Sequence, residues 1–286
     1  MKNILILGTS LFDNLIYSKT PIQNQQCTKV KNYLIPGGSM FNVAHNCGLL
    51  NLPTSFYTIL GNDSLSVNIQ TTLINKNVNI YYKLVDQSTP IFTYIQDSEK
   101  TLKTSSITSD FHITNENEIP HDVLRHSEYL VTDNKDYELI IKIKKINNKI
   151  KIISSGYIPD NNHQYLYEGS ILNKDEFIAQ NHHTNYEKHC RSTQLKFIVI
   201  TLASDGCYYY QNQISNICSA TNKGIGYEIG CGDSFISGIL YGIYHNYSFD
   251  QTIKLANKCA NYTYNTPLNF NKEIVEITLT NKEDYD

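Results

Sequence analysis

The run Gly230-Cys231-Gly232-Asp233 places two glycines and a carboxylate directly before a helical pattern that continues through Leu240. Glycines at a helix start let the backbone approach a ligand closely, and the free N–H groups and helix dipole there favour an anion. A carboxylate in the first turn would lie beside a bound phosphate, where it could act as general base toward an attacking hydroxyl. A plain glycine turn with Asp233 as a helix-capping acid explains the same residues, so the run alone leaves both interpretations open.

A second glycine run, Pro36-Gly37-Gly38, precedes another helical pattern, with Ser39 as the expected N-cap. Two glycines leave room for a ligand against the backbone. Asn42, one turn into the helix, can both donate and accept hydrogen bonds to hydroxyl groups. These residues indicate a site for a hydroxyl-bearing ligand, and an ordinary loop-to-helix junction is the alternative.

Asn173 and Glu176 lie three residues apart after the apolar pair Ile171-Leu172. At the end of a strand, this pair could reach a hydrated Mg²⁺ through water molecules, because Mg²⁺ prefers oxygen ligands and keeps several waters. Taken alone, the pair is explained better by a helix N-terminus with acids in its first turn, which is a common arrangement.

Two familiar nucleotide motifs are missing from the chain. No GxxxxGK[ST] occurs, which excludes a Walker-type phosphate loop. The first strand is followed by Gly8-Thr9-Ser10-Leu11-Phe12-Asp13, which is not GxGxxG, so a nicotinamide-dependent oxidoreductase is disfavoured.

The elements that must position these residues follow from apolar periodicity. Short apolar runs alternate with helical patterns, which favours a parallel sheet covered by helices on both faces. The expected strands are 3–7, 55–60, 129–132, 150–154, 170–172 and 197–202, and the expected helices are 39–50, 65–73, 232–245 and 250–264.

Two segments differ from this alternation. Residues 14–35 and 79–105 are β-prone, polar and rich in Tyr and Phe, with polar breaks typical of hairpins. We expect them to form a small sheet outside the main core. The sequence gives no internal repeat and no linker, so residues 1–286 are expected to form one domain.

Composition limits the classes of protein. The chain has 286 residues, 41% of them hydrophobic, and a net charge of −3, which argues against a nucleic-acid or membrane-surface partner. Seven widely spaced cysteines without a CxxC predict free thiols and a cytoplasmic location. The apolar run Ile4–Leu7 is too short for a signal peptide, and no run approaches the ~18 residues of a membrane helix.

Taken together and in order, these motifs resemble the ribokinase-like, PfkB-type family of sugar and nucleoside kinases over nearly the whole chain. Residues 230–235 resemble its C-terminal signature, with Cys231 where Ala is usual, and residues 36–44 resemble its N-terminal glycine motif. Residues 173–176 are similar to its NxxE magnesium motif, and residues 201–206 resemble a segment that lines the ATP site.

The resemblance implies a three-layer α/β sandwich with a small β lid, here 14–35 and 79–105, and transfer of phosphate from ATP to a hydroxyl with Mg²⁺. It implies Asp233 as catalytic base beside an anion hole at Gly230, Cys231 and Gly232. The remaining implied positions are substrate contacts at Asp13, Gly37, Gly38, Asn42 and Asp133, an ATP site at Asn173, Thr201, Ala203, Gly206, Gly232 and Asn257, and Mg²⁺ held through water by Glu176 and Asn173. A homodimer formed through the lid is compatible with it.

Three positions depart from the family pattern. Tyr227 stands where Asp often lies beside a monovalent-cation site, Ala203 replaces a usual Gly near the phosphates, and Ser66 replaces the second Gly of a GxDxxG pattern. These departures bring potassium activation into question and leave Asp233 in place.

Within the family, some stretches resemble pseudouridine kinases. These are 42–46 with Leu49-Leu50, 132–134, and the tail 264–268. Pseudouridine is therefore the expected acceptor. A ribokinase- or fructokinase-type sugar kinase stays open, as does a non-catalytic protein that only senses a sugar or nucleoside.

Overall fold

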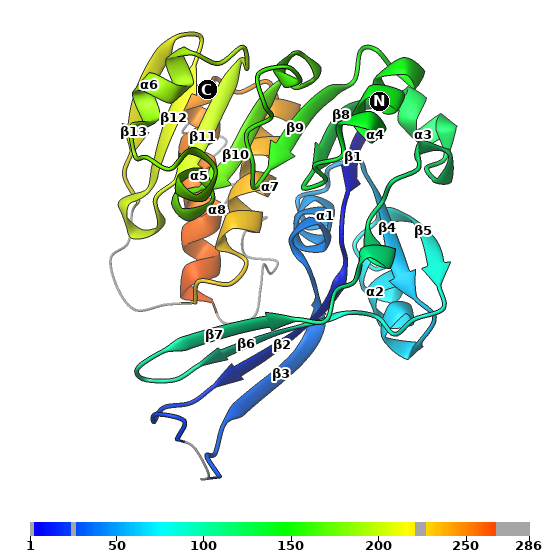
Figure 1. Cartoon of the computed structure of the whole chain (residues 1–286), viewed down its shortest axis with the longest axis vertical. Coiled ribbons are helices and arrows are strands. Elements are labelled where there is room, and N and C mark those ends of the chain that lie inside the picture. The colour runs from blue at the N-terminus through cyan, green and yellow to red at the C-terminus, as the bar shows by residue number, and fades with distance from the viewer. Residues whose placement is uncertain (1–2, 24–26, 221–226, 267–286) are drawn as a thin grey trace.

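The structure is a computed structural model that describes residues 3–23, 27–220 and 227–266. Its centre is a nine-stranded sheet in the order β13-β12-β11-β10-β9-β8-β1-β4-β5 (Figure 1). The β11–β12 and β12–β13 ladders are antiparallel, and the others are parallel. The strands are β1 (Asn3–Leu7), β4 (Thr54–Gly61), β5 (Val78–Val85), β8 (Ser127–Thr132), β9 (Lys151–Ser155), β10 (Gly169–Asn173), β11 (Phe197–Thr201), β12 (Cys207–Gln211) and β13 (Ile214–Cys218).

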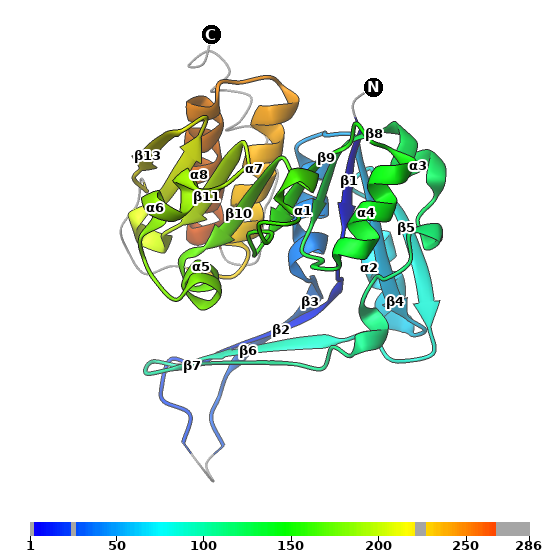
Figure 2. The same ribbon diagram turned by 45° about the horizontal axis from the view of Figure 1, so that its top comes forward.

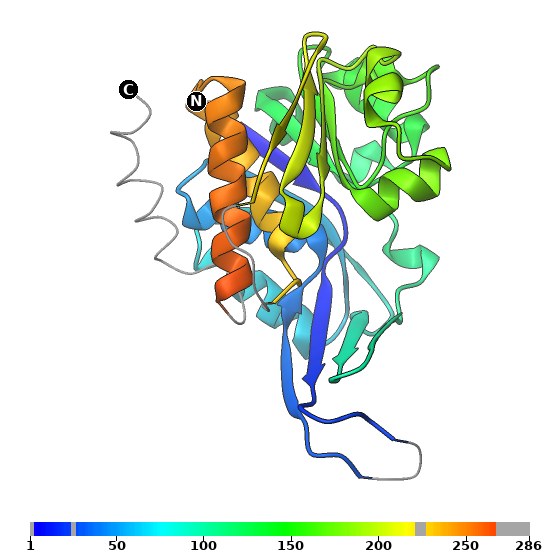
Figure 3. The same cartoon turned by 90° about the vertical axis from the view of Figure 1, so that its left-hand side faces the viewer.

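Helices cover both faces of this sheet, which confirms the predicted three layers (Figures 2 and 3). Side chains alternate between faces along a strand, so Ile4 and Ile6 of β1 join one core and Leu5 and Leu7 the other. The first core is covered by α1 (Ser39–Leu49), α2 (Ser64–Ile74), α7 (Cys231–Tyr244) and α8 (Phe249–Asn265). The second is covered by α3 (His121–His126), α4 (Tyr137–Ile146), α5 (Lys174–Asn181) and α6 (Tyr186–Arg191). Short 3₁₀ helices are η1 (Ser109–Phe111), η2 (Glu116–Glu118), η3 (Gln164–Leu166) and η4 (Ala203–Asp205).

A four-stranded sheet in the order β3-β2-β6-β7 projects from one end of the sandwich (Figure 1). Its strands are β2 (Leu11–Tyr17), β3 (Lys31–Gly37), β6 (Ile91–Gln96) and β7 (Thr101–Ser105). We call it the lid sheet. Its strand β2 follows β1 along the chain, and its strand β3 leads into α1. The lid sheet is therefore connected directly to the first strand and the first helix of the sandwich.

One predicted lid boundary is wrong. The segment 79–105 was expected to lie entirely in the lid, but its first part is β5, the edge strand of the main sheet. β5 pairs in parallel with β4 from Val78 opposite Thr54 to Val85 opposite Gly61, after a crossover through α2. Ile80 packs against one core and Val85 against the other, so apolar residues on both faces of β5 contact buried side chains.

In the described ranges, no helix combines the length and apolar character needed to cross a membrane. All seven cysteines lie in those ranges and are free thiols, as the spacing predicts.

Candidate active site

The predicted site residues gather where the parallel strands end. In an open α/β sheet, ligands bind at the carboxyl ends of the strands. Leu7 of β1 is in register with Thr132 of β8, and Asn173 of β10 with Thr201 of β11. Gly8 and Asp133 follow the first pair, and a Cβ on Gly8 would lie 2.5 Å from Asp133 Oδ1. The sheet therefore aligns two groups of candidates, one near β1 and β8 and one near β10 and β11.

Helix α7 supplies the third group. Its N-cap is Gly230, with φ 83°, a left-handed conformation that glycine adopts without steric cost. Cys231 is the first helical residue, and a Cβ on Gly232 would meet no atom of the described residues within 4 Å. The Cys231 thiol donates to the Tyr227 carbonyl at 3.1 Å, and burial raises its pKa to about 12, so it stays protonated. The Cys231 N–H donates to the Glu228 carbonyl at 3.3 Å, a long hydrogen bond that a bound anion would replace. N–H groups at a helix start are the usual donors to an anion.

The Asp233 carboxylate is held by helix α1. Ser39 Oγ donates to Asp233 Oδ1 at 2.6 Å, and Asn42 Nδ2 donates to Asp233 Oδ2 at 2.8 Å. The predicted role of Ser39 as N-cap is wrong, because Gly38 occupies the cap position and Ser39 is the first helical residue. Its hydroxyl, missed as a site group, is thereby directed across to α7. The carboxylate of Asp233 faces another helix and does not cap its own.

Burial dominates the acidity of this carboxylate. Loss of water raises the pKa of Asp233 to about 6, the hydrogen bonds from Ser39 and Asn42 oppose the rise, and the charge of Glu176 adds to it. A carboxylate with a pKa just below neutrality is ionised at neutral pH and is still basic enough to accept a proton.

Asp13 of β2 lies beside the Gly37-Gly38 turn. A Cβ on Gly37 would collide with the Asp13 carboxylate, and one on Gly38, whose φ is 98°, would lie 2.9 Å from the Thr9 carbonyl oxygen. Both glycines are therefore required by close approach. Asp13 is 6% exposed, and burial, followed by the Asp233 charge, raises its pKa to about 7 despite a hydrogen bond from the Gly38 backbone.

Of the predicted ATP-site residues, Asn173 ends β10, Thr201 ends β11, and Ala203 and Gly206 lie in the turn after β11, whereas Gly232 is on α7. Ala203 begins η4 and Gly206 follows it, with φ of 52° and 95°. Ala203 thus holds the left-handed conformation that the glycine usual at this position adopts more easily. Asn257 of α8 is buried and donates to the Cys218 carbonyl at 3.4 Å, so its amide also fastens the end of β13.

Asn173 and Glu176 form the start of α5. The Asn173 side chain accepts from the Glu176 N–H at 2.8 Å, and Glu176 Oε2 accepts from the Asn173 N–H at 2.7 Å, a capping box. The structure therefore confirms the helix-start interpretation of this pair. A single carboxylate with an amide oxygen fits water-mediated Mg²⁺ binding only, and the described residues hold no cluster of three His, Cys, Asp or Glu for direct coordination.

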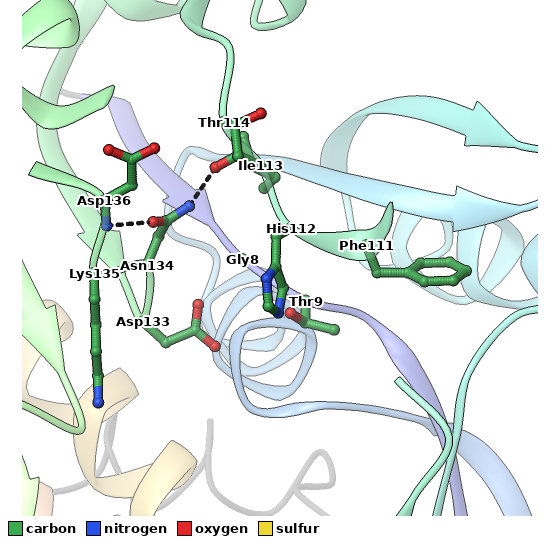
Figure 4. A pocket seen from close by; sticks show the side chains of 10 residues that line it. All are labelled: Gly8, Thr9, Phe111, His112, Ile113, Thr114, Asp133, Asn134, Lys135 and Asp136. Carbon is green, nitrogen blue, oxygen red and sulfur yellow. Dashed lines mark hydrogen bonds between the residues drawn. The ribbon is translucent and has the colours of Figure 1, made fainter. Parts of the chain in front are cut away.

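Asp133 lines a cavity of about 390 Å³ beside the end of β1 (Figure 4). Burial, with a smaller contribution from the Asp233 charge, raises its pKa to about 7. Sequence reasoning missed His112 and Thr114, because residues 107–119 have no regular periodicity. The lining residues are Gly8, Thr9, Phe111, His112, Ile113, Thr114, Asp133, Asn134, Lys135 and Asp136.

The two remaining residues that depart from the family pattern, Tyr227 and Ser66, make structural contacts. Tyr227 donates its backbone N–H to the Tyr264 carbonyl at 2.9 Å, and its ring meets Tyr17 of the lid sheet edge-on at 5.9 Å. The Ser66 hydroxyl donates to the Asp63 carbonyl at 2.7 Å, and its N–H donates to the Asp63 carboxylate. Ser66 thus stabilises the first turn of α2.

Comparison with solved structures shows a ribokinase-like fold. The ribokinase of Thermotoga maritima is 15% identical, covering 98% of this chain and 100% of that one, with a TM-score of 0.83. The ribokinase of Giardia lamblia is 18% identical over 98% of both chains, with a TM-score of 0.80. That of Arabidopsis thaliana, solved with ribose and ATP, is 14% identical over 98% and 99%, with a TM-score of 0.79.

Sequence comparison names the family. Curated proteins yield no match to this chain. The family model described as pfkB family carbohydrate kinase matches residues 1–267, nearly the whole length. The chain therefore belongs to the pfkB family of carbohydrate kinases and is a phosphotransferase that acts on an alcohol group.

Proposed function

We propose that this kinase transfers the γ-phosphate of ATP to the 5′-hydroxyl of pseudouridine, giving pseudouridine 5′-phosphate and ADP. The observation that carries the catalytic part is the Asp233 carboxylate at the start of α7, held by Ser39 and Asn42 from α1. The acceptor hydroxyl forms a bond to the γ-phosphorus while the bond from that phosphorus to the β-phosphate oxygen breaks. Asp233 takes the hydroxyl proton.

The other residues position the reactants. The backbone N–H groups of Gly230, Cys231 and Gly232 stabilise the charge that spreads over the transferring phosphate. On the acceptor side, Asp13, Gly37, Gly38 and Asn42 hold the sugar hydroxyls. On the ATP side the residues are Asn173, Thr201, Ala203, Gly206 and Asn257. Glu176 and Asn173 would hold Mg²⁺ through water, and the bound ion would supply positive charge against the phosphates.

Support for pseudouridine comes from where the subfamily-like stretches lie. Residues 42–46 and Leu49 are on α1, which holds Asp233, and residues 132–134 end β8 at the cavity. Asn265 and Thr266 end α8, while Pro267 and Leu268 lie outside the described residues. C-linked uracil has an N–H donor that uridine lacks, and Asp133, which lines the cavity, is the acceptor that we propose for it.

The acceptor preference is tested by kcat/KM for pseudouridine, uridine, ribose and fructose under one set of conditions. We expect pseudouridine to be the best acceptor, because sites that bind a buried polar group can discriminate by ~10⁴–10⁵-fold against analogues lacking it. A higher value for ribose or fructose would assign a ribokinase- or fructokinase-type substrate. Binding of pseudouridine without any phosphorylated product would indicate a sensor.

Glu176→Gln tests the magnesium assignment separately from the helix cap. Glutamine keeps an oxygen that accepts the Asn173 N–H, so α5 should start normally, while the negative charge is lost. We expect the Mg²⁺ concentration for half-maximal activity to rise with little change in the KM for the acceptor. Glu176→Ala also removes the hydrogen bond from the Asn173 N–H, while the Asn173 side chain still accepts from the backbone N–H of residue 176, so we expect a small additional loss of stability. An unchanged Mg²⁺ curve in Glu176→Gln would leave this residue with the capping role alone.

A further inference from the structure

The cavity beside Asp133 has a wall that is fixed by its own hydrogen bonds. Phe111 and Ile113 are each 2% exposed, so the alternation along 111–114 turns His112 and Thr114 outward. Asn134 Nδ2 donates to the Ile113 carbonyl at 2.6 Å, and Tyr157 donates its hydroxyl to the Asn134 carbonyl at 2.5 Å. This segment is therefore fastened to the end of β8, and the cavity between them is preformed.

The cavity adjoins the place proposed for the sugar through Gly8 and Thr9. Gly8 and Thr9 line it, and the Thr9 carbonyl lies against Gly38 of the glycine turn. A Cβ on Gly8 would touch both Asp133 Oδ1 and Met40 of α1, the helix that holds Asp233. A ligand whose hydroxyl lies at Asp233 can therefore extend over Gly8 into this cavity.

The cavity lining combines the planar imidazole of His112 with a hydrogen-bond acceptor, Asp133, and a donor, Lys135. Figure 4 shows Asp133 and His112 on facing sides of the cavity. Lys135 is also a lining residue, and its ammonium group lies 5.6 Å from the centre of the Tyr157 ring. Asp133 accepts hydrogen bonds, Lys135 donates them, and an imidazole ring stacks on planar groups. The volume of about 390 Å³ is near the lower end of the roughly 300–1,000 Å³ typical of ligand pockets.

We propose that this cavity is a second subsite, which binds the planar heterocyclic base of a nucleoside acceptor, with His112 and Lys135 as specificity-determining residues. The base stacks against His112, a ring N–H donates to Asp133, and a ring carbonyl accepts from Lys135. The alternating N–H and C=O groups of a pyrimidinedione match this pair. The proposal rests on the proposed phosphoryl transfer for the placement of the sugar.

The test uses the full chain with His112→Ala, Lys135→Met and the control His126→Ala. His126 is exposed on α3 and contacts the Asp122 carbonyl, outside the cavity lining. The first readout is kcat/KM for pseudouridine divided by kcat/KM for ribose. Since stacking on an aromatic side chain is worth ≈1–3 kcal/mol per base, we expect His112→Ala to lower this ratio about 10-fold, chiefly through KM. Lys135→Met should lower it in the same direction, and the control should keep the wild-type ratio.

The second readout is calorimetric binding of pseudouridine without ATP, which needs no turnover. We expect about 10-fold weaker binding in His112→Ala than in the wild type and in His126→Ala. If wild type binds pseudouridine in this His112-dependent way but phosphorylates nothing, the subsite stands and the proposed function fails. If ribose or a disaccharide is phosphorylated while no nucleoside binds, the subsite is wrong and the phosphotransferase stands. Equal ratios and equal affinities in all variants would also overturn the subsite.

Discussion

Asp233→Asn is expected to lower kcat by about 10²–10⁴-fold while leaving ATP affinity largely unchanged. The amide keeps the shape of the side chain but cannot take a proton from the acceptor hydroxyl. It can still accept from Ser39 or Asn42 through its oxygen, so the contact between α1 and α7 should survive. The measurements are steady-state kinetics and ATP binding on the same preparations. A near-normal kcat in this variant would remove Asp233 from the proposed mechanism.

The pH profile gives a second signature of the same residue. The base must be ionised, and the pKa of Asp233 is raised to about 6, so wild-type kcat should rise as the pH increases through about 6. Asp233→Asn should lack this limb. Ser39→Ala is a matched control: it keeps the carboxylate but removes a hydrogen bond that lowers its pKa. We therefore expect Ser39→Ala to move the midpoint upward and to lower kcat by less than Asp233→Asn does.

Gly206→Ala is expected to lower the free energy of unfolding by at least about 2 kcal/mol. Gly206 has φ 95°, and a Cβ there would collide with the Cys218 carbonyl and lie 2.6 Å from the Ala220 nitrogen. Backbone atoms cannot move aside as a flexible side chain can, and a strained φ costs about 1–3 kcal/mol by itself. The turn joins β11 to β12 and belongs to the proposed ATP site. The fraction of this variant that folds should therefore also bind ATP more weakly.

Gly232→Ala is the matched stability control for that variant. Its Cβ would meet no atom of the described residues within 4 Å, and alanine inside a helix lowers the entropy of the unfolded chain. We expect its free energy of unfolding to stay the same or to rise by about 0.4–1 kcal/mol. Chemical denaturation of both variants beside the wild type makes the comparison. Equal losses in the two would mean that the Gly206 turn tolerates a side chain.

The layers of this fold follow from local patterns. Residues 39–50 and 232–245 were predicted as helices, and α1 and α7 occupy them within one residue at each end. The strand at 79–85 was misassigned because a β-prone run does not reveal which sheet it joins. That depends on the crossover through α2, which brings Val78 opposite Thr54. The hairpin of β12 and β13 was not predicted, since Tyr208, Tyr209 and Tyr210 show no alternation of apolar and polar residues.

The site was less accessible to sequence reasoning than the fold. Asp233 meets Ser39 and Asn42 across 194 and 191 residues, and no local pattern encodes such a contact. The family resemblance brought Asp233 and Asn42 together, while Ser39 was taken for a cap because serine commonly is one. Sequence reasoning missed His112 and Lys135 because both lie in segments without regular periodicity. Their shared position at the cavity depends on the hydrogen bond from Asn134 to the Ile113 carbonyl, which no local pattern encodes.

The most direct measurement follows the labelled γ-phosphate of ATP in the presence of pseudouridine and Mg²⁺, with wild type and Asp233→Asn in parallel. The account predicts that wild type moves the label onto the 5′-oxygen of pseudouridine, with one ADP formed per labelled product. Asp233→Asn should form that product at least about 10²-fold more slowly. Label that stays in ATP, or that reaches only inorganic phosphate, would contradict the account.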